Sequence, residues 1–168
     1  MIRLFITSFA IFWGSQVLAQ KTVDNLIESG NQKEELKDYK GALADFNNAL
    51  LIEPNNSEVL YYCGFMKFQM EDYANALTDY DLAIASDTAS VELFYCRGNT
   101  KFELKFFKEA ISDYDRAILL DSTDRETYFN RAIAKYYIGQ KESSCKDLHL
   151  ALKYGDKDAE AVLKEFCY

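Results

Sequence analysis

The chain has 168 residues, 27 of them acidic and 19 basic, which gives a formal net charge of −8. This excess of negative charge argues against nucleic acid as a partner, because phosphate binding depends on clustered lysine and arginine. Four cysteines and a single histidine occur without the paired spacing of a zinc site, so neither a structural metal nor a cofactor is expected.

Residues 1–19 are predicted to be a signal peptide. Arg3 is their only charge, residues 4–13 are almost wholly apolar, and residues 17–19 supply the side chains expected before a cleavage site. Cleavage after Ala19 would leave a mature chain with a net charge of −9, exported to the periplasm or secreted. An uncleaved anchor is the alternative, although the apolar stretch is shorter than the ~20 residues that span a bilayer. No membrane span is expected in the mature chain.

A pattern then returns every 34 residues between about residue 23 and residue 155. Its clearest mark is an alanine followed by leucine or isoleucine and preceded, four residues earlier, by aspartate; these alanines are Ala49, Ala83, Ala117 and Ala151. A unit of this size cannot bury its own apolar face, so neighbouring units must stack around a continuous core. We predict units at residues 23–56, 57–90, 91–124 and 125–156, the last of which diverges from the others.

Each unit is predicted to form two amphipathic helices of about 14 residues, because apolar positions recur every three or four residues. In the second unit these helices cover residues 57–70 and 73–86. Residues that favour helix N-termini mark the breaks between units, and Thr123 with Glu126 is predicted to form a capping box. Residues 157–168 are assigned to a short closing helix that covers the last unit.

Several positions of the unit hold the same kind of residue in register. Position 8 holds Gly30, Gly64, Gly98 and Ala132, position 17 holds Tyr39, Tyr73, Phe107 and Lys141, and position 20 holds Ala42, Ala76, Ala110 and Ser144. This pattern resembles the tetratricopeptide repeat (TPR) family. The resemblance implies an all-α fold, a right-handed α-solenoid of four helix-turn-helix repeats with a C-terminal capping helix, in which small residues allow close helix packing.

Two charged positions also recur, lysine at position 11 and aspartate at position 23. The pairs are Lys33 with Asp45, Lys67 with Asp79, Lys101 with Asp113, and Lys135 with Asp147. Across an antiparallel helix pair each lysine can reach its carboxylate, and Arg97 and Arg131 at position 7 can reach the carboxylates of their own units. We interpret these residues as a structural charge ladder.

The resemblance implies that positions 2, 5, 6, 9, 12 and 13 of each first helix line an inner, concave surface. The partner-binding residues expected there are Tyr61, Tyr62, Phe65, Phe68, Tyr95, Asn99, Phe102, Phe129, Asn130, Ile133, Tyr136 and Tyr137. Glu58, Glu92 and Glu126 recur beside them at position 2. Aromatic rings, asparagines and carboxylates together suit an extended or helical protein segment with apolar and basic side chains. The alternative is that several of these rings pack within the stack.

These observations predict a non-enzymatic scaffold for protein–protein interaction, without catalytic residues. His149 is assigned to a solvated outer face, and aspartates two residues apart, such as Asp79 and Asp81, point in different directions and cannot share an ion. The alternative function is structural self-assembly into homo-oligomers. A third is a thiol enzyme using Cys63 or Cys96, which requires a lowered thiol pKa that Arg97 would supply only to Cys96.

Cys145 and Cys167 lie 11 residues on either side of Asp156. If a turn at this point joins two antiparallel helices, the two cysteines lie level with each other, and an oxidising compartment allows them to pair. We therefore predict a disulfide that fastens the closing helix to the last unit. Cys63 and Cys96 are interpreted as small buried hydrophobic residues.

Overall fold

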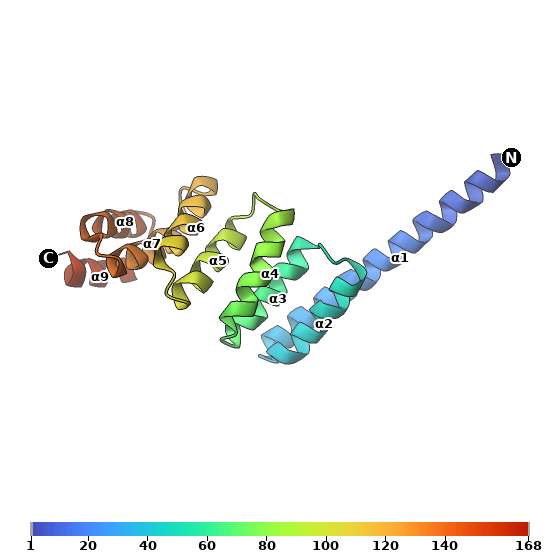
Figure 1. Ribbon diagram of the computed structural model, residues 1–168, viewed down its shortest axis with the longest axis horizontal. Helices are drawn as coiled ribbons and strands as arrows, with labels where there is room; N and C mark the ends of the chain where they lie inside the picture. The colour runs from blue at the N-terminus through green and yellow to red at the C-terminus, as the bar shows by residue number, and fades with distance from the viewer. Residues whose placement is uncertain (1, 168) are drawn as a thin grey trace.

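The computed structural model describes the backbone of residues 2–167 and the side chains of residues 16–167. Within residues 2–167 it contains nine α-helices and no strand. The helices are α1 (Ile2–Glu35), α2 (Tyr39–Ile52), α3 (Ser57–Gln69), α4 (Tyr73–Ser86), α5 (Val91–Glu103), α6 (Phe107–Leu120), α7 (Arg125–Tyr137), α8 (Lys141–Lys153) and α9 (Asp158–Phe166). Figure 1 shows one elongated stack from α2 to the C-terminus, with the first half of α1 projecting away from it.

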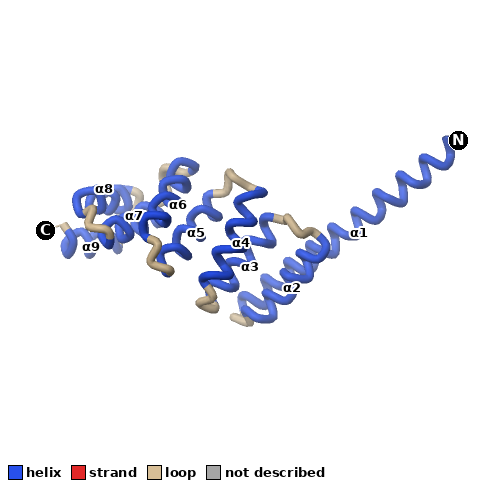
Figure 2. Tube along the Cα trace, viewed as in Figure 1, coloured by secondary structure: helices blue, strands red, loops and turns tan. Residues whose placement is uncertain are grey.

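Consecutive helices form pairs, and the pairs stack in chain order. Helix α1 packs with α2, α3 with α4, α5 with α6 and α7 with α8, and each pair contacts the next. Short loops join the helices, as Figure 2 shows. The first helices α3, α5 and α7 also contact their neighbours of the same kind, so they form one continuous surface. The predicted all-α solenoid of stacked helix pairs is thus confirmed.

Ring and glycine pairs hold each of the first three helix pairs together. Tyr114 is buried, and a Cβ atom added at Gly98 would lie 2.6 Å from its ring. The same arrangement joins Phe46 to Gly30 and Tyr80 to Gly64. In the fourth unit the smaller Leu148 replaces the ring and Ala132 replaces the glycine. Close approach therefore requires glycine only where an aromatic ring lies beneath it.

The turn inside each helix pair contains one residue in the left-handed region of φ. These residues and their φ values are Lys37 (60°), Glu71 (61°), Lys105 (66°) and Gly139 (77°). A residue with a Cβ atom is disfavoured there by roughly 1 kcal/mol or more, whereas glycine is not. The divergent fourth unit is therefore the one without backbone strain at this turn.

The charge ladder is present in every unit. The lysine Nζ lies 2.5, 2.5, 2.7 and 2.8 Å from the aspartate Oδ2 in units one to four, as the sequence predicts. Arg97 donates two hydrogen bonds to Asp113, at 2.9 and 2.6 Å, and Arg131 makes the same contacts with Asp147. The side-chain exposure of the ladder aspartates falls from 14% and 11% in the first two units to 5% in the third and fourth.

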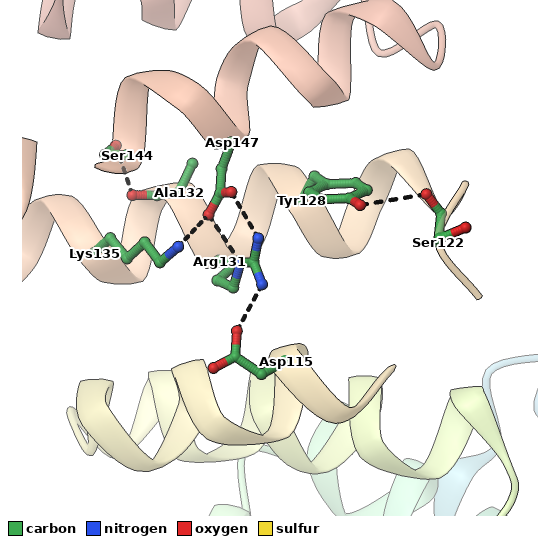
Figure 3. Close-up of polar contacts among 8 residues, drawn as sticks. All are labelled: Asp115, Ser122, Tyr128, Arg131, Ala132, Lys135, Ser144 and Asp147. Carbon is green, nitrogen blue, oxygen red and sulfur yellow. Dashed lines mark hydrogen bonds and ion pairs between the residues drawn. The ribbon is translucent and has the colours of Figure 1, made fainter. Parts of the chain in front are cut away.

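The two arginines also connect neighbouring units, which the sequence did not predict. Figure 3 shows Arg131 between Asp147 of its own unit and Asp115 of the preceding one, with Nη1 2.6 Å from Asp115 Oδ1. Arg97 reaches Asp81 in the same way at 2.7 Å. The paired aspartates of α4 and α6 therefore face different partners. The aspartate at position 25 of one unit thus contacts the arginine at position 7 of the next unit, and this contact joins the two units.

One helix start differs from the prediction. The capping box of Thr123 and Glu126 does not form, because the Thr123 hydroxyl donates to Asp121 at 2.7 Å. Asp124 caps α7 instead, accepting from the Glu126 backbone N–H at 3.2 Å and from the Thr127 hydroxyl. The helix consequently begins one residue later than a cap at Thr123 would allow.

Helix α9 covers the last helix pair. Ala159 and Leu163 are buried against a cluster that contains Tyr128 and Leu148. The Cys145 and Cys167 sulfur atoms lie at bonding distance, and their Cα atoms are 6.0 Å apart. This geometry accommodates the predicted disulfide, whose formation in the cell stays a prediction.

Helix α1 includes the backbone of residues 2–19 of the predicted signal peptide. The side chains of residues 1–15, most of that segment, lie outside the described residues. No helix in the part of the chain that was described combines the length and apolarity needed to cross a membrane.

Candidate functional site

The first helices α3, α5 and α7 present partly exposed side chains on one side of the stack. Nine of the predicted partner-binding residues line hollows on this surface, which we call the groove. They are Tyr61, Phe65 and Phe68 of α3, Tyr95, Asn99 and Phe102 of α5, and Phe129, Asn130 and Ile133 of α7. All nine are partly exposed. Their positions in three successive units explain why they converge.

Two hollows form the floor of the groove. The larger lies between α5 and α7, measures about 340 Å³, and is lined by Phe102, Phe129 and Ile133 among others. The smaller lies between α3 and α5 and measures about 240 Å³. Phe68 and Asn99 belong to both, so the two hollows adjoin each other. Each is lined mainly by rings and aliphatic groups, which suits apolar side chains of a ligand.

The two asparagines of the floor have partners within the protein. Asn99 Oδ1 accepts from the Tyr114 hydroxyl at 2.8 Å and from Asn130 Nδ2 at 3.0 Å. Asn130 Nδ2 also lies 3.1 Å from the Tyr95 hydroxyl, which in turn donates to Glu126 at 3.4 Å. This network fixes α5, α6 and α7 in register. These asparagine contacts are therefore made within the protein itself.

Three predicted groove residues pack against neighbouring rings. Tyr62 stacks on Phe46 at 5.1 Å between ring centroids, Tyr136 stacks on Phe166 of α9 at 3.7 Å, and Tyr137 stacks on Phe107 at 4.9 Å. These stacking partners lie outside the groove floor. Tyr136 and Tyr137 nevertheless remain 40% and 61% exposed. Tyr137 also lies 5.7 Å from Phe102 of the groove, measured between ring centroids, so stacking does not remove these two rings from the exposed surface.

A third hollow of about 470 Å³ lies at the rim, where the first helices begin. Its walls are the rings of Tyr61, Phe65 and Tyr95. Its carboxylates are Glu92, Asp121, Asp124 and Glu126. The two glutamates were expected at the rim, but the two aspartates were missed, because they belong to the loop between α6 and α7. Their only sequence signal is the acidic run that ends the third unit.

Cys96 lies on the wall of the groove and is not an activated thiol. Burial raises its pKa to about 11, although hydrogen bonds involving the Tyr61 and Tyr80 hydroxyls oppose that rise. The Arg97 guanidinium is bound by Asp81 and Asp113, so it is not directed toward this thiol. These observations argue against the thiol-enzyme alternative at Cys96.

Cys63 is equally unsuited to nucleophilic chemistry. It is fully buried, and burial raises the pKa of its thiol to about 12. His149 is exposed on α8, as expected. Among the described residues, no group of three or more histidine, cysteine, aspartate or glutamate side chains is placed to hold a metal ion.

No protein-family model matches the chain, and no curated protein matches its sequence. Solved structures do match it. It superposes on the MamA protein with a TM-score of 0.76 and 21% identity, covering 80% of this chain and 74% of MamA. A tetratricopeptide repeat protein from Parabacteroides merdae matches with a TM-score of 0.76 and 19% identity, over 87% of this chain and 60% of that protein. The chain has the TPR fold.

A third TPR structure was solved with a ligand. The first TPR of Spaghetti (RPAP3), bound to the HSP90 peptide SRMEEVD, matches with a TM-score of 0.70 and 22% identity, over 71% of this chain and 94% of that domain. One TPR subtype that recognises C-terminal carboxylates uses lysine at position 5 and arginine at position 6. This chain has Ile27, Tyr61, Tyr95 and Phe129 at position 5, and Glu28, Tyr62, Cys96 and Asn130 at position 6, so it lacks the residues of that subtype.

Proposed function

We propose that this TPR protein is an exported, non-enzymatic scaffold that binds a segment of another protein in the groove of α3, α5 and α7. The observation that carries this proposal is the run of partly exposed rings over three successive units. Contiguous exposed apolar surface of this kind marks interaction sites in soluble proteins. Binding of the HSP90 peptide by the RPAP3 domain supports the use of this fold for holding peptides.

Photocrosslinking tests where the partner binds. A benzophenone amino acid is introduced at Phe65 or Phe129 in the groove, or at Leu119 on the outer helix α6 as a control, in the organism that makes the protein. We expect the groove positions to crosslink one partner that mass spectrometry identifies, and the outer position to give no such product. Equal yields at Phe129 and Leu119 would contradict binding in the groove.

Self-assembly is the second candidate function, and exposed leucines on the outer helices favour it. Leu51 and Leu119 occupy the same position of their units and are 82% and 72% exposed. Light scattering across a concentration series tests this candidate. A mass that rises with concentration, and that falls to the monomer in Leu51→Gln/Leu119→Gln, would identify homo-oligomers.

Export rests on the sequence of residues 1–19. Expression in a bacterial host with a secretion system, followed by intact mass measurement, tests it. We expect the protein to lose these residues and to begin at Gln20. A chain that keeps residues 1–19 would contradict cleavage after Ala19 and would favour the uncleaved anchor.

A further inference from the structure

We propose that the bound segment carries an arginine or lysine that lies in the rim hollow, next to a large apolar side chain that fills the hollow between α5 and α7. This inference rests on the proposed function and adds the chemistry and placement of the ligand. It follows from the connection between the hollows, from the charge of the rim and from the rings that surround it.

The three hollows form a continuous path from the rim to the floor. The rim hollow shares Phe65, Tyr95 and Cys96 with the smaller floor hollow. The smaller floor hollow shares Phe68 and Asn99 with the larger one. A single segment laid across α5 therefore reaches the carboxylates and the apolar floor at the same time.

The rim hollow carries negative charge without a cation of its own. No lysine or arginine lines it. Across residues 16–167, no ion pair includes Glu92, Asp121, Asp124 or Glu126. The ion pairs of the first helices instead join lysines and arginines to aspartates of α2, α4, α6 and α8. The negative charge at the rim is therefore free to attract a cationic ligand.

Helix capping explains only part of this cluster. Asp121 and Asp124 accept hydrogen bonds within the loop and at the start of α7, and Glu92 and Glu126 stand in first turns, where helix dipoles favour anions. Capping does not require that three rings enclose the same carboxylates. Aromatic faces and carboxylates both attract a cation, and an arginine or lysine side chain also packs its aliphatic part against rings.

The preference for a cation is local to this part of the groove. The neighbouring hollow beside α9 shares Tyr95 and Glu126 with the rim hollow, but it also contains Arg125 and Lys157 together with Asp156 and Asp158, so charges of both signs are present there. The peptide bound by the RPAP3 domain, SRMEEVD, is acidic at its C-terminal end. The carboxylates of this rim would repel such an end. The ligand chemistry proposed here is thus opposite in charge.

Selection from a phage library of random decapeptides on the immobilised protein tests the proposal. The strongest peptides are synthesised, and their affinities are measured by calorimetry for the parent and for two charge-matched double variants. Glu92→Gln/Glu126→Gln removes two of the four rim carboxylates. Glu109→Gln/Glu142→Gln neutralises first-turn glutamates of the outer helices α6 and α8 and changes the net charge equally. Circular dichroism confirms that each variant stays helical.

We expect enrichment of peptides with arginine or lysine beside a large apolar residue, a loss of about tenfold in affinity in the rim variant, and no change in the control. Loss of binding in Phe65→Ala/Phe129→Ala shows that a peptide binds through the groove. If such peptides lack a basic residue, or bind the rim variant as tightly as the parent, this inference is overturned and the proposed function stands. Failure to select any peptide that depends on the groove would overturn both.

Discussion

Removing the carboxylate of Asp113 should strongly destabilise the protein, because this side chain binds two cations in a nearly dry place. It accepts from Arg97 Nε and Nη2 at 2.9 and 2.6 Å and from Lys101 Nζ at 2.7 Å. Its side chain is only 5% exposed. Taking one partner out of a buried ion pair leaves uncompensated charge and costs about 3–5 kcal/mol. We expect Asp113→Ala to lose about 4 kcal/mol of unfolding free energy, and the charge reversal Asp113→Lys to lose more.

Asp81 provides the matched control. It binds the same Arg97 through one contact of 2.7 Å, but its side chain is 56% exposed. Exposed pairs contribute about 0–1 kcal/mol, so Asp81→Ala should cost no more than about 1 kcal/mol. Urea unfolding followed by circular dichroism measures both. If the two variants unfold at the same urea concentration, or if Asp113→Lys unfolds like the parent, burial does not give the ladder its strength and the reasoning fails.

Three further predictions concern the packing, the turns and the acid response. Gly98→Ala should cost about 1–3 kcal/mol, because its Cβ atom would lie 2.6 Å from the Tyr114 ring. Adding Tyr114→Leu, which copies the Ala132 and Leu148 pair, should make the double variant more stable than the sum of the single effects predicts, whereas strict additivity would count against the contact. Gly139→Ala should cost about 1 kcal/mol through the backbone alone, since no atom lies within 4 Å of the added Cβ, and an unchanged urea midpoint would contradict this. Burial raises the pKa of Asp45, but hydrogen bonds from Lys33 and Ser29 outweigh it and leave the pKa below the ordinary 3.8, so its stabilisation is lost as the pH falls through that lowered pKa. Burial raises the pKa of Asp79 and Lys67 only partly offsets it, so the cost of the ionised carboxylate disappears as the pH falls through that raised pKa. On acidification, the stability loss from Asp45→Asn should therefore shrink and that from Asp79→Asn should grow. Parallel pH profiles for the two variants would show that these environments do not differ.

The sequence predicted those features that depend on contacts within one unit. The 34-residue period located the helices, and the 12-residue separation of Lys101 and Asp113 predicted their ion pair. The contact of Arg97 with Asp81 was not predicted, because it depends on the distance between neighbouring units, which a repeat pattern does not specify.

The groove was predicted in part for the same physical reason. Repeat positions identified Phe65 of α3 and Phe129 of α7, because both helices contact α5 in the stack. They did not indicate that α9 would place Phe166 over Tyr136, because the docking of a closing helix lies outside the repeat. Asp121 and Asp124 were missed as rim residues because loop geometry brings them beside α5.

The central claim is that partly exposed rings on the first helices, and not the apolar surface as a whole, capture the partner. The most direct test compares the affinity of the selected peptide for Phe65→Ala/Phe129→Ala with its affinity for Leu51→Ala/Leu119→Ala, which removes two more exposed apolar side chains from the outer helices. We predict at least about a tenfold loss for the groove variant, because buried aromatic anchors carry most of the binding energy, and no loss for the outer variant. Equal affinities for the two variants would contradict the account.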